Sequence, residues 1–245
     1  SLRILFQFII IFIRMHNYNS NLSKKILRWY DDNKRTLPWR AIRSKKKLEF
    51  CTLVSEYMLQ QTQVKTVIPY FNTFIKRFKN IETFSRAKKT TVLKYWEGLG
   101  FYSRAKNLHE SAKIILKHYG GRMPKNFEEL KSLPGVGDYT ASMIMAIVNN
   151  KPHIALDGNV KRLFKRFFLL PELENKKNLN LIKNKKKYFI HKKRHGDLVQ
   201  ALIEIGALVC KPKKPHCIKC PINKYCLSRD SQFVIKKNKK IKKVN

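Results

Sequence analysis

The chain has 245 residues, a length that suits one large domain or two small ones. Its 53 Lys and Arg outnumber 16 Asp and Glu, and the net charge of +37 favours a polyanionic partner such as nucleic acid, although an AT-rich genome also enriches Lys, Asn and Ile. A hydrophobic content of 43% argues against global disorder, 9 Gly and 9 Pro exclude a collagen-like chain, and five Cys are too few for a disulfide-stapled secreted domain.

The N-terminal segment holds an apolar run from Ile4 to Ile13. A run of about 10 residues is half of the roughly 20 that a membrane-spanning helix needs. No small-x-small cleavage site follows it, so a signal peptide is disfavoured. We therefore expect residues 1–19 to be an extension of the fold, or Met15 to be the functional start, in a cytoplasmic protein without a membrane anchor.

Helical periodicity begins at Leu22. Apolar residues recur at intervals of three and four through Ile26 and Tyr30, and again over residues 53–78. No segment combines strict alternation with hairpin turns, so the sequence predicts an all-α fold. Residues 174–195 read as a loop and a solvated helix face, and residues 231–245 as a basic tail.

A glycine-rich turn, Leu-Pro-Gly-Val-Gly, joins two short predicted helices at residues 133–137. Gly135 and Gly137 let the backbone approach a ligand closely, and N–H groups at the following helix N-terminus can bind a phosphate without sequence preference. An ordinary helix–helix turn is the alternative. Asp157 follows twenty residues later and is either a helix cap or a carboxylate that faces the sugar of a bound nucleotide.

Four cysteines cluster near the C-terminus with the spacing C-x6-C-x2-C-x5-C; they are Cys210, Cys217, Cys220 and Cys226. Four thiolates suit tetrahedral zinc or a [4Fe–4S] cluster, and the single CxxC pair favours the iron–sulfur cluster. Two disulfides are improbable in a cytosolic chain. The loop at residues 211–216 carries three Lys that could contact phosphates, whereas Cys51 reads as a buried hydrophobic residue.

Together, the hairpin, the downstream Asp and the cysteine spacing resemble the helix-hairpin-helix DNA glycosylases that carry an iron–sulfur cluster. The resemblance covers residues 22–227. It implies a two-lobed all-α monomer with DNA bound between the lobes and a structural [4Fe–4S] cluster. One lobe is expected at residues 45–148, with the helix-hairpin-helix at about 122–142. The other combines residues 20–44 and 149–230.

Two motifs discriminate within this superfamily. A lyase of the endonuclease III type has a Lys two residues after the last hairpin Gly to form a Schiff base, but Tyr139 stands there. Residues 55–64, SEYMLQQTQV, closely match the adenine glycosylase motif SEVMLQQTQV. The resemblance makes Glu56 the acid that protonates adenine, with its pKa raised by burial, and Gln61 the residue that inserts beside the flipped base.

The resemblance also assigns the remaining site residues. Asp157 would stabilise the oxocarbenium-like sugar, with Asn159 and Tyr139 beside it. Residues expected to contact DNA or the base are Trp39, Arg40, Gln61, Phe101, Gly135, Gly137, Lys161 and Gln200. The family usually has Tyr at the intercalating position of Phe101. The chain is also about four residues longer between Arg40 and Glu56, and it has Glu49-Phe50 where Pro-Tyr is usual.

These residues predict a monofunctional glycosylase that excises adenine opposite 8-oxoguanine or guanine in duplex DNA. An endonuclease III-type lyase and a catalytically silent iron–sulfur DNA-binding protein are the alternatives. The family's C-terminal Nudix-like domain would follow Asn245, and we expect it to be lost or truncated. Preference for 8-oxoguanine over guanine opposite adenine should then be weaker.

Overall fold

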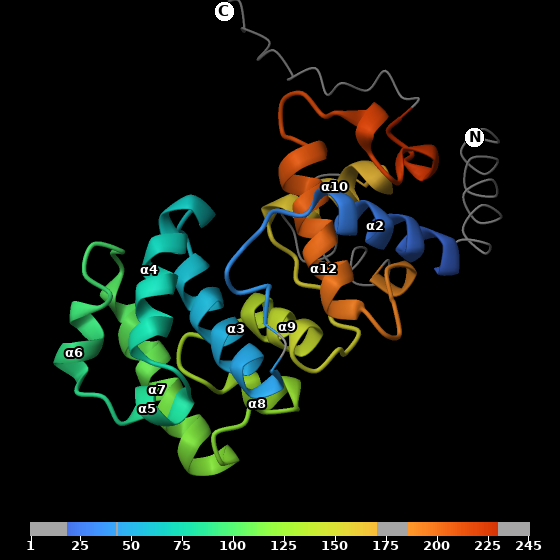
Figure 1. The fold of residues 1–245 in the computed structure, drawn as a ribbon. Coiled ribbons are helices and arrows are strands. Elements are labelled where there is room, and N and C mark those ends of the chain that lie inside the picture. The colour runs from blue at the N-terminus through green and yellow to red at the C-terminus, as the bar shows by residue number, and fades with distance from the viewer. Residues whose placement is uncertain (1–18, 43, 171–185, 230–245) are drawn as a thin grey trace, which may run out of the picture. The chain divides into compact units, whose positions relative to one another are not determined.

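The computed structural model describes residues 19–42, 44–170 and 186–229, and these contain α-helices and short 3-10 or π-helical turns but no strand (Figure 1). The all-α prediction is therefore confirmed for this part of the chain. The basic tail at 231–245, residues 1–18 of the expected extension and residues 174–185 of the expected loop lie outside it. No helix in the described ranges is long and apolar enough to cross a membrane.

The described residues belong to two compact units. Of the described residues, one unit comprises 30–42, 44–156 and 190–201, and the other comprises 19–29, 157–170, 186–189 and 202–229. We call them the hairpin unit and the cysteine unit. This division places residues 30–42, 44, 149–156 and 190–201 with the hairpin unit, whereas the sequence predicts them in the cysteine lobe.

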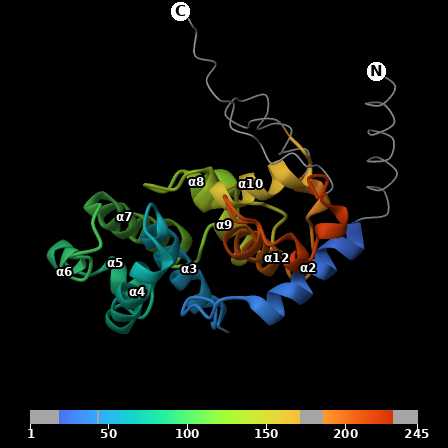
Figure 2. The ribbon, with the colours of Figure 1, turned by 90° about the horizontal axis from the view of Figure 1, so that it is seen from above.

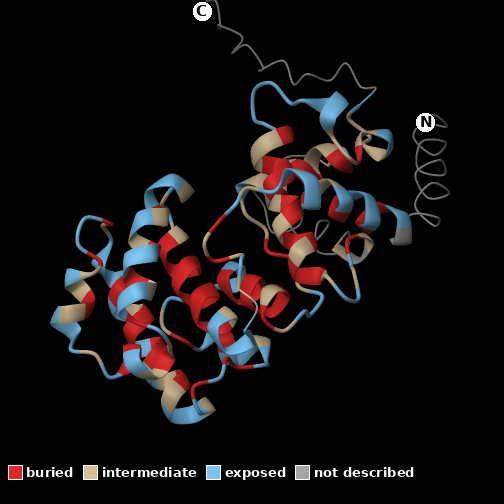
Figure 3. Ribbon diagram, in the orientation of Figure 1, coloured by how far each residue is buried: buried red, intermediate tan, exposed pale blue. Residues whose placement is uncertain are grey.

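The hairpin unit is built around one helix that is buried on all sides. Its helices are α3 (Lys45–Leu59), α4 (Val64–Arg77), α5 (Ile81–Ser85), α6 (Lys89–Lys94), α7 (Tyr102–Tyr119), α8 (Phe127–Lys131), α9 (Asp138–Ile147) and the first part of α12 (His195–Glu204). Residues 49–58 of α3 are all buried, and the helix lies between α4 and α9 (Figures 1, 2 and 3). A helix without a solvent face must be enclosed by its neighbours, so α3 is the centre of this unit.

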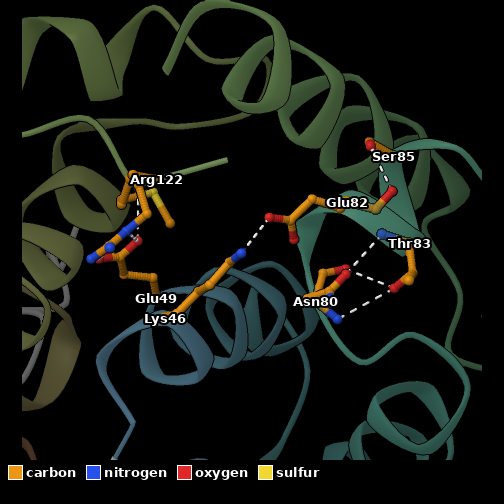
Figure 4. Close-up of polar contacts among 8 residues, drawn as sticks. Lys46, Glu49, Asn80, Glu82, Thr83, Ser85 and Arg122 are labelled. Atoms are coloured by element: carbon orange, nitrogen blue, oxygen red, sulfur yellow. Dashed lines mark hydrogen bonds and ion pairs between the residues drawn. The ribbon is translucent and has the colours of Figure 1, made fainter. Parts of the chain in front are cut away.

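Aromatic packing and one ion pair to a buried carboxylate fix the helices around α3. The Phe74 ring meets the Phe84 and Trp96 rings edge to face, with centroids 5.2 and 6.2 Å away. Glu49 stands in α3 where the family usually has Pro, and its side chain is buried. It accepts hydrogen bonds from the Arg122 guanidinium at 2.7 Å and from the Met123 backbone N–H at 3.0 Å (Figure 4). This pairing satisfies a carboxylate that would otherwise be costly to bury.

The insertion between Arg40 and Glu56 also makes a defined contact. Lys46 forms an ion pair with Glu82 of α5 at 2.5 Å, and it lowers the pKa of that carboxyl (Figure 4). Asn80 and Thr83 close a capping box at the N-terminus of α5, with Asn80 accepting from the Thr83 N–H at 2.8 Å. The additional residues therefore join α3 to α5.

In the cysteine unit, helix α10 (Gly158–Phe167) packs against a π-helical turn, η2 (Ile205–Val209). The unit also contains most of α2 (Asn19–Asn33), the end of α12, and the 3-10 turns η1 (Lys186–Tyr188), η3 (Cys217–Lys219) and η4 (Asn223–Tyr225). Phe189 is fully buried among Phe164, Phe167 and Phe168, with ring centroids 4.8 to 5.9 Å apart. This aromatic cluster fixes the position of α10 within the unit.

Candidate functional site

The predicted hairpin connects α8 to α9. Gly135 has a φ of +77°, and a Cβ there would lie 2.9 Å from the Asn107 amide nitrogen and 3.3 Å from the Tyr57 ring. Glycine is thus required both by the backbone conformation and by the close approach of two side chains. Gly137 is the N-cap of α9 and is exposed, as is Gly135. The turn therefore presents backbone on its outer side while its inner side packs on α3 and α7.

Two polar contacts fix this turn to α3. The Tyr57 hydroxyl donates to the Pro134 carbonyl and lies 2.8 Å from the Ser111 hydroxyl, and the Gln60 amide donates to the Gly135 carbonyl at 3.2 Å. Glu56 precedes Tyr57 on the same helix and is buried, with 5% of its surface exposed. The candidate acid Glu56 is therefore the direct neighbour, on α3, of the residue that binds the hairpin.

Two residues expected to insert into the DNA stack are presented by strained turns. Gln61, in the connection between α3 and α4, has a φ of 56°, and Phe101, which precedes α7, has a φ of 49°. Both side chains are exposed, Phe101 by 58%. A left-handed backbone is unfavourable for residues other than glycine, and such strain persists where the surroundings impose it.

The expected adenine-pocket residues come together only in part. The Arg40 Nε donates to the Gln200 side-chain oxygen at 2.8 Å, which joins positions 160 residues apart in the sequence. The Arg40 guanidinium also lies over the Tyr30 ring at 5.7 Å. Trp39, in contrast, is 92% buried in the core of the hairpin unit and meets Phe71 edge to face at 5.2 Å. Only a small part of the Trp39 ring is available to a base.

Asp157 is the N-cap of α10, and both of its carboxylate oxygens accept hydrogen bonds. Oδ1 accepts from the Val160 N–H at 2.7 Å, and Oδ2 accepts from the Asn159 amide at 2.9 Å. Asp157 therefore caps α10, which leaves its role toward a sugar open, and Asn159 lies beside the carboxylate. Lys161 is half-buried, and its backbone N–H donates to the Asp157 backbone carbonyl at 2.9 Å. The carboxylate has a fixed orientation at the start of the helix.

An arginine that the sequence analysis missed connects this carboxylate to the cysteines. Arg162 donates to the Asn159 side-chain oxygen at 2.9 Å, to the Gly206 carbonyl at 2.7 Å and to the Cys210 carbonyl at 2.8 Å. One turn further along α10, Arg166 donates to the Cys210 sulfur at 3.4 Å. Asn159, Arg162 and Arg166 form a continuous polar row along α10.

The four predicted metal ligands line one cavity of about 930 Å³ beside α10. None of the four forms a disulfide. Among the described residues no three His, Cys, Asp or Glu side chains converge on a single-ion site; the cysteines surround a shared space instead. Burial raises the pKa of Cys220 to about 12 and that of Cys226 to about 11. Four cysteines that line one cavity fit the ligand set of an iron–sulfur cluster.

The remaining predicted residues divide between the units. Glu56, Tyr139, Gln61 and Phe101 belong to the hairpin unit, whereas Asp157, Asn159, Lys161 and the cysteines belong to the cysteine unit. Tyr139 lies in the first turn of α9 with 36% of its surface exposed. Arg162 has no sequence signal of its own, because a chain with 53 basic residues offers many equivalent candidates.

Comparison with known proteins gives consistent results. Residues 54–187 match the family described as HhH-GPD superfamily base excision DNA repair protein. The adenine DNA glycosylase of Buchnera aphidicola subsp. Baizongia pistaciae is 40% identical over 220 residues, which cover 88% of this chain and 61% of that protein. The human adenine DNA glycosylase is 36% identical over 215 residues, which cover 83% of this chain and 38% of that protein. This chain spans about 60% of the length of its bacterial relatives.

Solved structures agree on the fold. A thermostable thymine-DNA glycosylase superposes with a TM-score of 0.76 at 26% identity, covering 87% of this chain and 97% of that one. A trapped endonuclease III–DNA covalent intermediate superposes with a TM-score of 0.65 at 22% identity, covering 84% of this chain and 92% of that one. The predicted helix-hairpin-helix glycosylase fold is confirmed. The chain belongs to the HhH-GPD superfamily of base excision DNA repair proteins.

Proposed function

We propose that the chain is a monofunctional DNA glycosylase that removes adenine mispaired with 8-oxoguanine or guanine. The observation that carries this proposal is the buried Glu56, which lies on α3 within a motif that matches adenine glycosylases. Adenine is a poor leaving group as an anion, so cleavage of its glycosidic bond requires protonation of a ring nitrogen. A buried carboxylic acid can supply that proton once the base has been flipped out of the duplex.

Asp157 is proposed to act on the sugar. Departure of adenine leaves an oxocarbenium-like ring, which a fixed carboxylate stabilises before water attacks. The hydrogen bonds from the Val160 N–H and the Asn159 amide hold the Asp157 carboxylate in one orientation. A carboxylate held in this way stabilises the developing positive charge without having to reorganise.

Tyr139 favours the monofunctional reaction over the lyase. Strand cleavage through a Schiff base requires an amine, and the tyrosine phenol cannot form one. We propose that Tyr139 contacts the sugar near Asp157 instead. The endonuclease III-type lyase and the silent DNA-binding protein remain the two alternatives that the experiment below separates.

The cofactor is proposed to be a [4Fe–4S] cluster held by Cys210, Cys217, Cys220 and Cys226. When bound, it would cross-link the cysteine loops to one another as a structural centre, since four protein ligands leave no open coordination site for a substrate. Arg166 supports this assignment through its donation to the Cys210 sulfur. The chain's residues thus supply both the ligands and a positive charge beside them.

The proposed partner is duplex DNA containing an A:8-oxoguanine or A:G mispair, bound by a monomer in the bacterial cytoplasm. Backbone N–H groups of the hairpin at Gly135 and Gly137, together with Lys161 and the lysines of residues 211–216, are assigned to phosphates. Gln61 and Phe101 are assigned to the base stack, and Arg40 with Gln200 to the flipped adenine. The exposed positions of Gln61 and Phe101 support this assignment.

The test is a single-turnover assay on an A:8-oxoguanine duplex, with and without alkali. Strand breaks only after alkali support the proposal, breaks without alkali identify a lyase, and tight binding without cleavage identifies a silent binder. Glu56→Gln should reduce excision by about 10²–10⁴-fold while leaving DNA affinity intact. Glu110→Gln, which breaks an exposed ion pair with Lys113 on α7, is the matched control. Excision by Glu56→Gln at the native rate would remove Glu56 from its role.

A further inference from the structure

Gln61 and Phe101 share an uncommon backbone conformation although they lie in different connections. Each is a non-glycine residue in the left-handed region, and each presents an exposed side chain. Under the proposed function both side chains must enter the base stack in one event, so the two turns need a fixed relative position. Neither turn contains a helix or a disulfide that could fix this relative position. The hydrogen bonds of one buried side chain connect the two turns instead.

That side chain is Arg104, on the first turn of α7. It is 94% buried, and its guanidinium lies between the two turns. On one side, Nη1 donates to the Met58 carbonyl at 2.9 Å, to the Gln60 carbonyl and to the Thr62 hydroxyl at 3.0 Å. These groups bracket Gln61, so a single nitrogen defines the path of the chain on both sides of that residue.

The other terminal nitrogen holds the second turn. Nη2 donates to the Leu99 carbonyl at 3.2 Å and to the Gly100 carbonyl at 3.1 Å, which directly precede Phe101. The guanidinium carbon also lies 5.1 Å from the Phe101 ring centroid, within the range of a cation–π contact. Trp96 donates to the same Gly100 carbonyl at 3.0 Å. Among the described residues the partners of Arg104 are carbonyls and a hydroxyl rather than carboxylates.

The geometry of these bonds explains why the residue is arginine. The carbonyls of Gln60 and Gly100 belong to the peptide planes immediately before Gln61 and Phe101, and the orientation of each plane sets the φ of the residue that follows. A planar guanidinium presents donors in two directions at a fixed separation, which a lysine ammonium cannot do. We propose that Arg104 is a positioning residue that locks both turns, so that Gln61 and Phe101 enter the DNA stack as one unit.

The first experiment tests this proposal without DNA. Hydrogen–deuterium exchange is measured on the folded chain for the peptides that cover residues 59–63 and 99–102. Arg104→Met should raise exchange by tenfold or more in both peptides together, because one side chain holds both. Arg122→Met, which removes the bonds to Glu49 in the same unit, is the matched control and should leave both peptides unchanged. Faster exchange in one turn alone, or in neither, overturns the proposal.

The second experiment measures insertion itself and rests on the proposed function. A duplex carries 2-aminopurine next to the mispaired adenine, and its fluorescence rises when the stack is opened. At saturating protein, Arg104→Met should lose more than half of this rise, while duplex affinity changes by less than threefold. Arg104→Lys should remain folded and recover only part of the rise. A purely structural role would reduce the folded fraction but leave the rise per folded molecule unchanged, and that result overturns the proposal.

The two proposals fail in different ways. If the native chain opens the stack but excises no adenine, and Arg104→Met raises exchange in both peptides, the proposed function fails and the role of Arg104 stands. If the native chain excises adenine and folded Arg104→Met opens the stack as the native chain does, the role of Arg104 fails alone. Should Arg104→Met not fold, the same comparison is made with Arg104→Lys, for which native exchange and a native rise overturn the proposal.

Discussion

At the scale of single residues, Tyr57 shows how a side chain next to the proposed acid stabilises the hairpin. Its hydroxyl bonds the Pro134 carbonyl, and Ser111 donates to the same carbonyl at 3.2 Å. Burial raises the pKa of Tyr57 to about 12, so the phenol keeps its proton across the neutral range. The motif that this segment resembles has Val at this position, so the bond is a feature of this chain rather than of the motif.

Tyr57→Phe should lower the free energy of unfolding by about 1–2 kcal/mol, because it removes a hydroxyl from a buried network and keeps the ring. The measurement is urea unfolding followed by circular dichroism. Tyr119→Phe, at the partly exposed end of α7, is the matched control and should change stability by less than about 0.5 kcal/mol. A loss of the same size in both variants would show that Tyr57 contributes no specific bond.

Site residues are predictable where their sequence neighbours form a motif. Glu56 is identified by the LQQTQ that follows it, and the cysteines by their spacing. The roles of Arg104 and Arg162 are not predictable in this way, because several of their partners are carbonyls of segments distant in the sequence. The burial that makes these two arginines important arises only when the helices pack together.

At the scale of elements, α10 begins at the proposed catalytic carboxylate and runs past the cysteine cavity. Its close packing on η2 depends on Gly206. A Cβ at that position would lie 2.6 Å from the Asn159 Cβ and 2.9 Å from the Asn159 carbonyl. The residue that orients Asp157 is therefore in direct contact with the turn that leads to Cys210.

Gly206→Ala should shift Asn159 and lower the free energy of unfolding by about 1–3 kcal/mol, as overpacking does. Single-turnover excision should fall as well, while duplex binding persists. Gly158→Ala, in the first turn of α10, is the matched control, because a Cβ at Gly158 would meet no atom within 4 Å. The prediction fails if Gly206→Ala matches Gly158→Ala in both thermal stability and excision rate.

The helices themselves follow largely from the sequence, and the turns do not. Periodicity predicts helices through residues 53–78, which the structure contains as parts of α3 and α4. The left-handed conformations of Gln61 and Phe101 carry no such signal, because neither residue favours a positive φ. They are imposed by packing and by Arg104, so the positions that the proposal assigns to the base stack are the hardest to derive from sequence.

At the scale of the whole molecule, the charge exceeds what internal pairing can neutralise. Sixteen acidic residues face 53 basic ones, and two of the acids pair with the same cation, since Arg194 bonds both Asp31 at 2.6 Å and Asp197 at 2.8 Å. The excess cations must remain solvated or meet a polyanion. Non-specific attraction to DNA that weakens steeply with salt is the expected consequence. Composition thus predicts the class of partner, whereas the reaction depends on a few buried groups.

Two buried histidines give the unfolding free energy a defined pH dependence. Burial lowers the pKa of His109, 5.3 Å from the Phe84 ring, and of His195, which bonds the His153 carbonyl. Below about pH 6.5 the unfolded chain binds protons that the folded chain excludes, so stability should fall from pH 7 to pH 5.5. His109→Gln should flatten this slope in urea unfolding, whereas His118→Gln, at an exposed position of α7, should leave it unchanged. Equal slopes in the two variants would mean that the buried imidazole accepts its proton without unfolding.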